Sequence, residues 1–148
     1  KDGRLPVFES NPLRLEIIPA PENVAEKMKI MPGDPVIRCL RDMSDNGERT
    51  GVDVAYLDLA TFRDLKIEDL EDVKGNLYKL YEEKLGVFIA DVTDILEFVI
   101  IDKEIQKICD LPLGTPLFFV TRQSRLLNKK TVEIRYEYCS AVNYRLRI

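Results

Sequence analysis

The chain has 148 residues, 45 % of them hydrophobic, which is enough for one folded domain with a core and argues against global disorder. Its net charge of −4 argues against a surface that binds a nucleic-acid backbone by itself, and no apolar run is long enough to span a bilayer. Because the chain has no histidine and no glycine-rich phosphate-binding loop, we expect no histidine catalysis, no cofactor and no metal site.

Three cysteines, Cys39, Cys109 and Cys139, lie in apolar contexts at spacings that fit no Cys-x-x-Cys pattern. An odd number of such residues is typical of buried, reduced thiols and not of a disulfide framework. We therefore expect a reducing compartment, the cytoplasm. The chain begins at Lys1 without an initiator methionine, and we interpret it as part of a longer protein.

Residues 1–11 are mostly polar and are interpreted as the remnant of a linker, so the folded domain is expected to span residues 12–148. Pro12 precedes a predicted strand over residues 13–18, in which Leu13, Leu15 and Ile17 alternate with polar positions. A short helix is predicted over residues 22–29, because apolar residues recur there at helical spacing.

A helix, a proline–glycine turn and a strand occur in this order twice. The first copy covers residues 22–41 and the second covers residues 102–122, with Gly33 and Gly114 separated by 114 − 33 = 81 residues. In each copy proline ends the helix and glycine supplies a backbone conformation that other residues resist. Return strands are predicted over residues 50–57 and 131–147. Two such copies predict a pseudo-symmetric body, in which a cleft between the halves could hold a ligand.

Between the two copies, residues 60–70 are predicted as short acidic helix. Asn76 is suited to cap a helix that ends at Gly86, and residues 87–101 are rich in β-formers. The whole pattern gives about six long strands, mostly joined by hairpins, with short helices between them. The sequence therefore predicts an α+β fold with an antiparallel β-sheet.

Several short motifs follow one another along the chain. They are Pro32-Gly33-Asp34-Pro35, Ala55-Tyr56-Leu57, Leu77-Tyr78-Lys79-Leu80-Tyr81-Glu82, Pro112-Leu113-Gly114-Thr115-Pro116, Val132-Glu133 and Asn143-Tyr144-Arg145. In this order, over about residues 13–148, they resemble the UTRA domain, the effector-binding and dimerising half of HutC-type regulators in the GntR superfamily. The resemblance implies a chorismate-lyase-like fold, a homodimer, a small-molecule effector, and contact with operator DNA only through an upstream winged helix-turn-helix domain.

The last strand carries the first candidate ligand-binding residues. Glu133, Arg135 and Glu137 share one face with Cys139, because side chains alternate along a strand. The resemblance implies that Glu133 faces the ligand, and Arg135 could pair with a ligand carboxylate. The alternative is a solvent-exposed face with weak surface ion pairs.

Five further candidates come from the two repeats. Arg41 and Arg122 occupy equivalent places, and one of them could clamp an anion. The alternative, which we favour, is that they are structural arginines paired with nearby acids. Val52, Val54 and Tyr56 could line the ligand cavity or lie in the core. Sugar-phosphate-binding members of the resembled family place arginines on the strand that carries Val52 and Val54, so the sequence predicts an effector that is less anionic than a sugar phosphate. We also expect an apolar wall from the first return strand and polar specificity from the second.

These features predict an effector-sensing domain of a bacterial transcriptional regulator and not an enzyme. Two alternatives remain open at this point. One is a chorismate-lyase-like enzyme, in which Glu133 would donate a proton and arginines would bind carboxylates. The other is a degenerate domain kept only for dimerisation.

Overall fold

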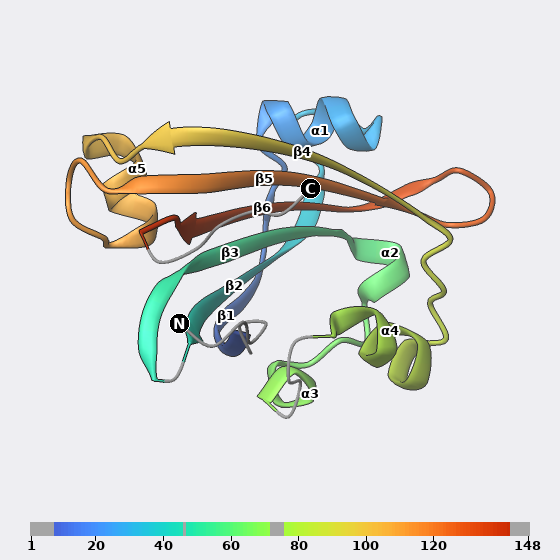
Figure 1. The fold of residues 1–148 in the computed structure, drawn as a ribbon. Helices are drawn as coiled ribbons and strands as arrows, with labels where there is room; N and C mark the ends of the chain where they lie inside the picture. The colour runs from blue at the N-terminus through green and yellow to red at the C-terminus, as the bar shows by residue number, and fades with distance from the viewer. Residues whose placement is uncertain (1–7, 46, 72–75, 143–148) are drawn as a thin grey trace.

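The structure, a computed structural model, describes residues 8–45, 47–71 and 76–142 (Figure 1). Within these residues, six strands and five short helices follow one another. In order they are β1 (Phe8–Pro19), α1 (Glu22–Met28), β2 (Pro35–Asp45), β3 (Glu48–Asp58), α2 (Leu59–Phe62), α3 (Ile67–Glu71), α4 (Leu77–Leu85), β4 (Asp91–Ile100), α5 (Lys103–Cys109), β5 (Pro116–Arg125) and β6 (Thr131–Ser140). None of the described helices is long and apolar enough to cross a membrane.

All six strands form one sheet in the order β1-β2-β3-β6-β5-β4, and every neighbouring pair is antiparallel. The first repeat supplies β1, α1, β2 and β3, and the second supplies β4, α5, β5 and β6. The two halves of the sheet meet where β3 pairs with β6. The predicted α+β class with a six-stranded antiparallel sheet is confirmed.

The repeat is visible in the backbone hydrogen bonds. Gly33 donates its N–H to the carbonyl oxygen of Ala20 at 3.0 Å, and Gly114 donates to that of Ile101 at 2.9 Å. Both glycines have a positive φ, +88° and +80°, which a residue with a Cβ resists. The two donor glycines are 81 residues apart (114 − 33), and so are the two acceptors, Ala20 and Ile101 (101 − 20). Each acceptor directly follows a strand, β1 or β4, so the predicted repeat also includes the strand before each helix.

The second hairpin is one residue longer than the first, and this changes which residues correspond. In the first hairpin Leu40 pairs with Val54, whereas in the second Thr121 pairs with Tyr136. The outgoing strands are therefore offset by 121 − 40 = 81 residues and the return strands by 136 − 54 = 82. Because side chains alternate along a strand, an offset of one residue exchanges the two faces.

The sheet has two faces, each covered by different helices. The first face carries Cys39, Ala55 and Leu57, which pack with Phe62, Leu80 and other residues of the helices α2 to α4. The second face is covered by α1 and α5. Figure 1 places α3 and α4 close together on one side of the sheet, well away from α5.

On the second face each repeat's helix packs on the return strand of the other repeat. Val24 and Met28 of α1 lie against Ile134 of β6, and Cys109 of α5 lies in one cluster with Val52 of β3. Hydrogen bonds follow the same crossed pattern, because Arg49 at the start of β3 donates to the carbonyl oxygen of Cys109 at 2.6 Å. These contacts join the two halves into one core.

Several predicted boundaries differ from the observed ones. β1 begins at Phe8, so residues 8–11 belong to the sheet and not to a linker; residues 1–7 lie outside the described part. β4 begins only at Asp91, after an extended segment, and β6 ends at Ser140. The predicted motif at residues 143–145 lies outside the described residues.

Candidate functional site

A group of charged and polar side chains, which we call the polar cluster, lies on the first face of the sheet. β6 places Glu133, Arg135 and Glu137 there, as the alternation predicts, and the neighbouring strands and α4 add the rest. The polar cluster consists of Arg41, Asp53, Tyr78, Tyr81, Asp94, Arg122, Ser124, Glu133, Arg135 and Glu137.

Glu133 is at the buried end of the polar cluster, with 0 % of its surface exposed. Arg135 donates from Nη2 to both of its carboxylate oxygens, at 3.0 and 2.8 Å. Tyr81 donates its hydroxyl to Oε2 at 2.7 Å, and Ser124 donates to Oε1 at 2.9 Å. Burial raises the pKa of Glu133, but the Arg135 charge and these hydrogen bonds outweigh it and hold the pKa below its ordinary value of 4.5.

Because its pKa is lowered, Glu133 is ionised near neutral pH and carries no proton to donate. The lyase alternative requires a proton donor at this position. The lowered pKa therefore does not fit the acid catalyst that this alternative would need.

Arg135 is the one buried arginine of the polar cluster with an unused donor. Its Nη2 bonds Glu133 and its Nη1 lies 3.7 Å from Glu137, yet its buried Nε has no hydrogen-bond partner among the described residues. The guanidinium also lies over the ring of Tyr78, 5.5 Å from the ring centroid. A buried donor without an acceptor costs free energy, so this atom marks a place where an added acceptor would stabilise the domain.

Glu137 lies nearer to solvent than Glu133. Burial raises its pKa above the ordinary value of 4.5, and Arg135 opposes that rise only in part. Asp53, which pairs with Glu137 across the strands, adds a second negative charge. Glu137 is thus the carboxyl group of β6 in the polar cluster whose pKa is raised, whereas that of Glu133 is lowered.

Arg41 and Arg122 both lie on the first face, each bonded to an aspartate. Arg41 is buried and donates to both carboxylate oxygens of Asp53. Arg122 donates from Nε and Nη2 to the two oxygens of Asp94, each at 2.7 Å, and keeps 27 % of its side chain exposed. Arg122 is therefore the more accessible of the two, and it sits beside Arg135 in the strand pairing.

Val52, Val54 and Tyr56 do not join the polar cluster. They pair with Tyr138, Tyr136 and Ile134 on the second face, with Val52 and Val54 fully in the core. The predicted apolar wall from the first return strand therefore lies on the opposite face of the sheet from the polar residues of the second return strand, and its contact with a ligand stays a prediction. Because the return strands are offset by 82 residues, the residue of β6 that corresponds to Val52 is Ile134 (134 − 52 = 82). With the 81-residue offset of the outgoing strands, the corresponding residue would have been Glu133. The apolar character of these valines says nothing about the charge of a ligand on the first face.

The sequence reasoning missed Tyr78, Tyr81, Ser124, Asp53 and Asp94. Tyr81 is part of the apolar stripe of α4, and only its hydroxyl reaches Glu133. One signal was present, because arginines on neighbouring predicted strands require carboxylates nearby when they are buried. Within the described residues, no group of three or more Cys, Asp or Glu side chains could hold a metal ion.

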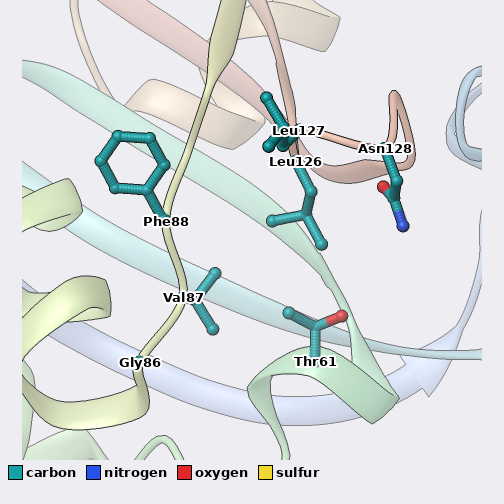
Figure 2. Close-up of a pocket in the computed structure, with 7 residues that line it drawn as sticks. All are labelled: Thr61, Gly86, Val87, Phe88, Leu126, Leu127 and Asn128. Atoms are coloured by element: carbon teal, nitrogen blue, oxygen red, sulfur yellow. The ribbon is translucent and has the colours of Figure 1, made fainter.

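A cleft of about 420 Å³ lies near the end of the β5–β6 hairpin. Figure 2 shows that α2, the segment after α4 and the hairpin each contribute to its wall. The wall is mostly apolar and is formed by Thr61, Gly86, Val87, Phe88, Leu126, Leu127 and Asn128. Phe88 and Leu127 are strongly exposed for apolar side chains. The cleft shares no residue with the polar cluster.

The lowered pKa of Glu133 predicts a loss of stability in acid. A carboxyl group with a lowered folded pKa stabilises the fold above its unfolded pKa, and this contribution disappears as the pH falls through the folded pKa. Glu137, with a raised pKa, contributes in the opposite sense. We expect the free energy of unfolding to fall between about pH 5 and about pH 3, with a shallower fall in Glu133→Gln and a steeper one in Glu137→Gln. Urea unfolding over a pH series measures this, and equal slopes in both variants would contradict it.

The family comparison and the structure comparisons agree with each other. The UTRA domain family matches residues 7–145. The ligand-binding domain of a GntR-family regulator from Bordetella bronchiseptica is 28 % identical, with a TM-score of 0.87 over 100 % of this chain and 91 % of that one. Two more distant structures share the fold. The effector domain of PhnF from Mycobacterium smegmatis is 17 % identical, with a TM-score of 0.75 over 95 % of this chain and 85 % of that one. YydK from Bacillus subtilis is 15 % identical, with a TM-score of 0.82 over 97 % of this chain and 62 % of that one.

The fold is chorismate-lyase-like, and the solved structures named above are transcriptional regulators or domains of them. The family match spans all of the described sheet, from the start of β1 to the end of β6. The chain belongs to the UTRA domain family.

Proposed function

We propose that the chain is the effector-binding domain of a HutC-type transcriptional regulator and that a small metabolite binds at the polar cluster. The family match and the likeness to a ligand-binding domain of a GntR-family regulator support the regulatory role. The observation that supports the position of the ligand is the buried Nε of Arg135, which has no acceptor in the described part of the chain. A ligand oxygen would satisfy this donor.

The charges of the polar cluster suggest the class of effector. Its three arginines, Arg41, Arg122 and Arg135, stand against four carboxylates, on residues 53, 94, 133 and 137. Each guanidinium already has a carboxylate partner, so no surplus positive charge is available for a doubly charged phosphate. We infer an effector with one acceptor group for Arg135 and hydroxyl or amine donors for Glu137, and less negative charge than a sugar phosphate.

In this proposal the domain acts as a homodimer in the cytoplasm. A winged helix-turn-helix domain upstream would contact operator DNA, and the effector would shift the dimer between two arrangements through its different affinities for them. The match to YydK, of which this chain covers 62 %, agrees with a domain that forms part of a longer regulator.

Calorimetry with a panel of metabolites tests the proposal. We expect a compound with one carboxylate or several hydroxyls to bind, and Glu137→Gln and Arg122→Gln each to weaken its binding by about tenfold to a hundredfold, as loss of one charged hydrogen bond does. Arg125→Gln is the matched control, because Arg125 also pairs with an aspartate of β4 but is not in the polar cluster. Tight binding of a phosphorylated sugar, with no binding of neutral or carboxylate compounds, would overturn the charge argument.

A further inference from the structure

Glu137 differs from the other three carboxylates of the polar cluster, because it accepts no hydrogen bond from the described residues. Asp53, Asp94 and Glu133 each receive hydrogen bonds from an arginine. The Oε1 atom of Glu137 lies 3.7 Å from Nη1 of Arg135, which exceeds hydrogen-bond length. The Glu137 side chain is nevertheless only 21 % exposed. Glu137 is therefore a largely buried acceptor that lacks a donor.

The unpaired acceptor and an unpaired donor belong to neighbouring side chains. The buried Nε of Arg135 has no acceptor in the described part of the chain. Arg135 and Glu137 are two residues apart on β6 and therefore project from the same face. A ligand that carries an acceptor and a donor close together would satisfy both groups. A carboxylate and an ammonium group on the same carbon atom have this spacing, and each forms strong, charge-assisted hydrogen bonds.

A second guanidinium group stands beside that of Arg135. Arg122 pairs directly with Arg135 across β5 and β6, and like charges in this arrangement repel each other. Both guanidinium groups lie near the ring of Tyr78, at 5.9 and 5.5 Å from its centroid. A ligand carboxylate here would reduce the repulsion, whereas the unpaired Glu137 favours a positive group. The polar cluster thus favours opposite charges at two adjacent places.

Apolar side chains border the polar cluster on the first face. Val120 pairs with Glu137, and Leu96 pairs with Val120, so these three residues lie in one row across β6, β5 and β4. The next row contains Phe118 and Phe98, whose ring centroids are 4.7 Å apart. We call Leu96, Phe98, Phe118 and Val120 the apolar strip. Leu96 and Phe98 are 40 % and 71 % exposed, so a ligand can bury apolar surface here.

We propose that the effector is an α-amino acid with an apolar side chain. Its carboxylate accepts a hydrogen bond from Nε of Arg135, its ammonium group donates to Glu137, and its side chain covers the apolar strip. Such a zwitterion adds no net charge to the polar cluster, in which four carboxylates already outnumber three arginines. This inference rests on the proposed function, because it takes the polar cluster to be the effector site, and it narrows the effector to one chemical class.

Calorimetry with L-leucine and two truncated analogues tests the class of effector. We expect L-leucine to bind, and isocaproate, which lacks only the ammonium group, to bind about tenfold to a hundredfold more weakly. Isoamylamine, which lacks only the carboxylate, is expected to lose a similar factor. In Glu137→Gln, L-leucine is expected to lose most of its advantage over isocaproate, because only the ammonium group depends on Glu137. Circular dichroism verifies that the variant is folded.

A pair of matched variants tests the apolar strip. We expect the parent chain to bind L-leucine at least about tenfold more tightly than L-alanine, because the larger side chain buries more apolar surface. Leu96→Ser is expected to reduce this ratio. Ile95→Ser is the control, because Ile95 is also exposed and apolar but lies on the second face. Equal ratios in the two variants would contradict the role of the apolar strip.

Failure of this inference is distinguishable from failure of the proposed function. If L-leucine, L-phenylalanine and L-methionine all fail to bind, the inference is wrong. If a polyhydroxy compound then binds and Glu137→Gln weakens its binding, the proposed function still stands. If L-leucine binds equally well to the parent chain, Glu137→Gln and Leu96→Ser, the ligand binds away from the polar cluster, and both proposals are wrong.

Discussion

Replacing Gly51 with alanine is expected to destabilise the domain severely. Gly51 lies on β3 opposite Cys139 of β6, and an added Cβ would lie 1.7 Å from the carbonyl oxygen of Tyr138. The obstructing atom belongs to the backbone of the central strand pair, so no side chain can move aside. We expect a loss of more than about 4 kcal/mol, against a total stability of about 5–15 kcal/mol for a typical domain.

The measurement is urea unfolding followed by circular dichroism. Gly47→Ala is the control, because Gly47 has a positive φ of +79° but open space around its Cβ position. Its expected cost is only about 1 kcal/mol. Equal losses in the two variants would show that the close approach at Gly51 is relieved by a small movement of β6.

Replacing Glu133 with leucine is expected to cost about 3–5 kcal/mol of folding free energy, because it leaves the buried Arg135 charge without a partner. It also removes the acceptor for the hydroxyl of Tyr81. Urea unfolding of the single variant at neutral pH measures the loss.

The double variant Glu133→Leu with Arg135→Met separates the two causes. Removal of both charges leaves no uncompensated ion, so we expect the double variant to regain most of the lost stability. A double variant as unstable as Glu133→Leu alone would mean that packing around β6, and not the unpaired charge, determines the cost.

Much of the fold could be predicted because its signals are local. The amide oxygen of Asn76 accepts a hydrogen bond from the backbone of Lys79 at 3.4 Å, and Gly86 ends α4 in the left-handed conformation, as their residue types indicate. The repeated glycines likewise mark the same turn in both halves. Each of these signals needs only a few neighbouring residues.

The site was predictable within one strand and not between strands. Alternation placed Glu133, Arg135 and Glu137 on one face, and the structure brings them together. Whether Val52 lies on the same face as Glu133 depends on the length of the second hairpin. Local sequence signals do not determine that length to within one residue. An error of one residue reverses the face.

The hydrogen-bond partners of the buried Glu133 carboxylate could not be predicted from the sequence, for a different reason. Tyr81 bonds Glu133 across 52 residues of sequence, and Tyr78 approaches the same carboxylate at 3.3 Å. Their positions depend on which face of the sheet α4 covers. Tertiary packing decides this, and the pattern of α4 alone specifies only that it has an apolar side.

The crossed packing of the helices on the second face implies that neither half of the chain has a closed core of its own. The residues that α1 needs on β6 come from the second half, and those that α5 needs on β3 come from the first. The domain is in this sense a covalently linked, intertwined pair of β-α-β-β units. A single unit, cut out by itself, would expose both the underside of its helix and its return strand, and would gain a complete interior only from a complementary unit.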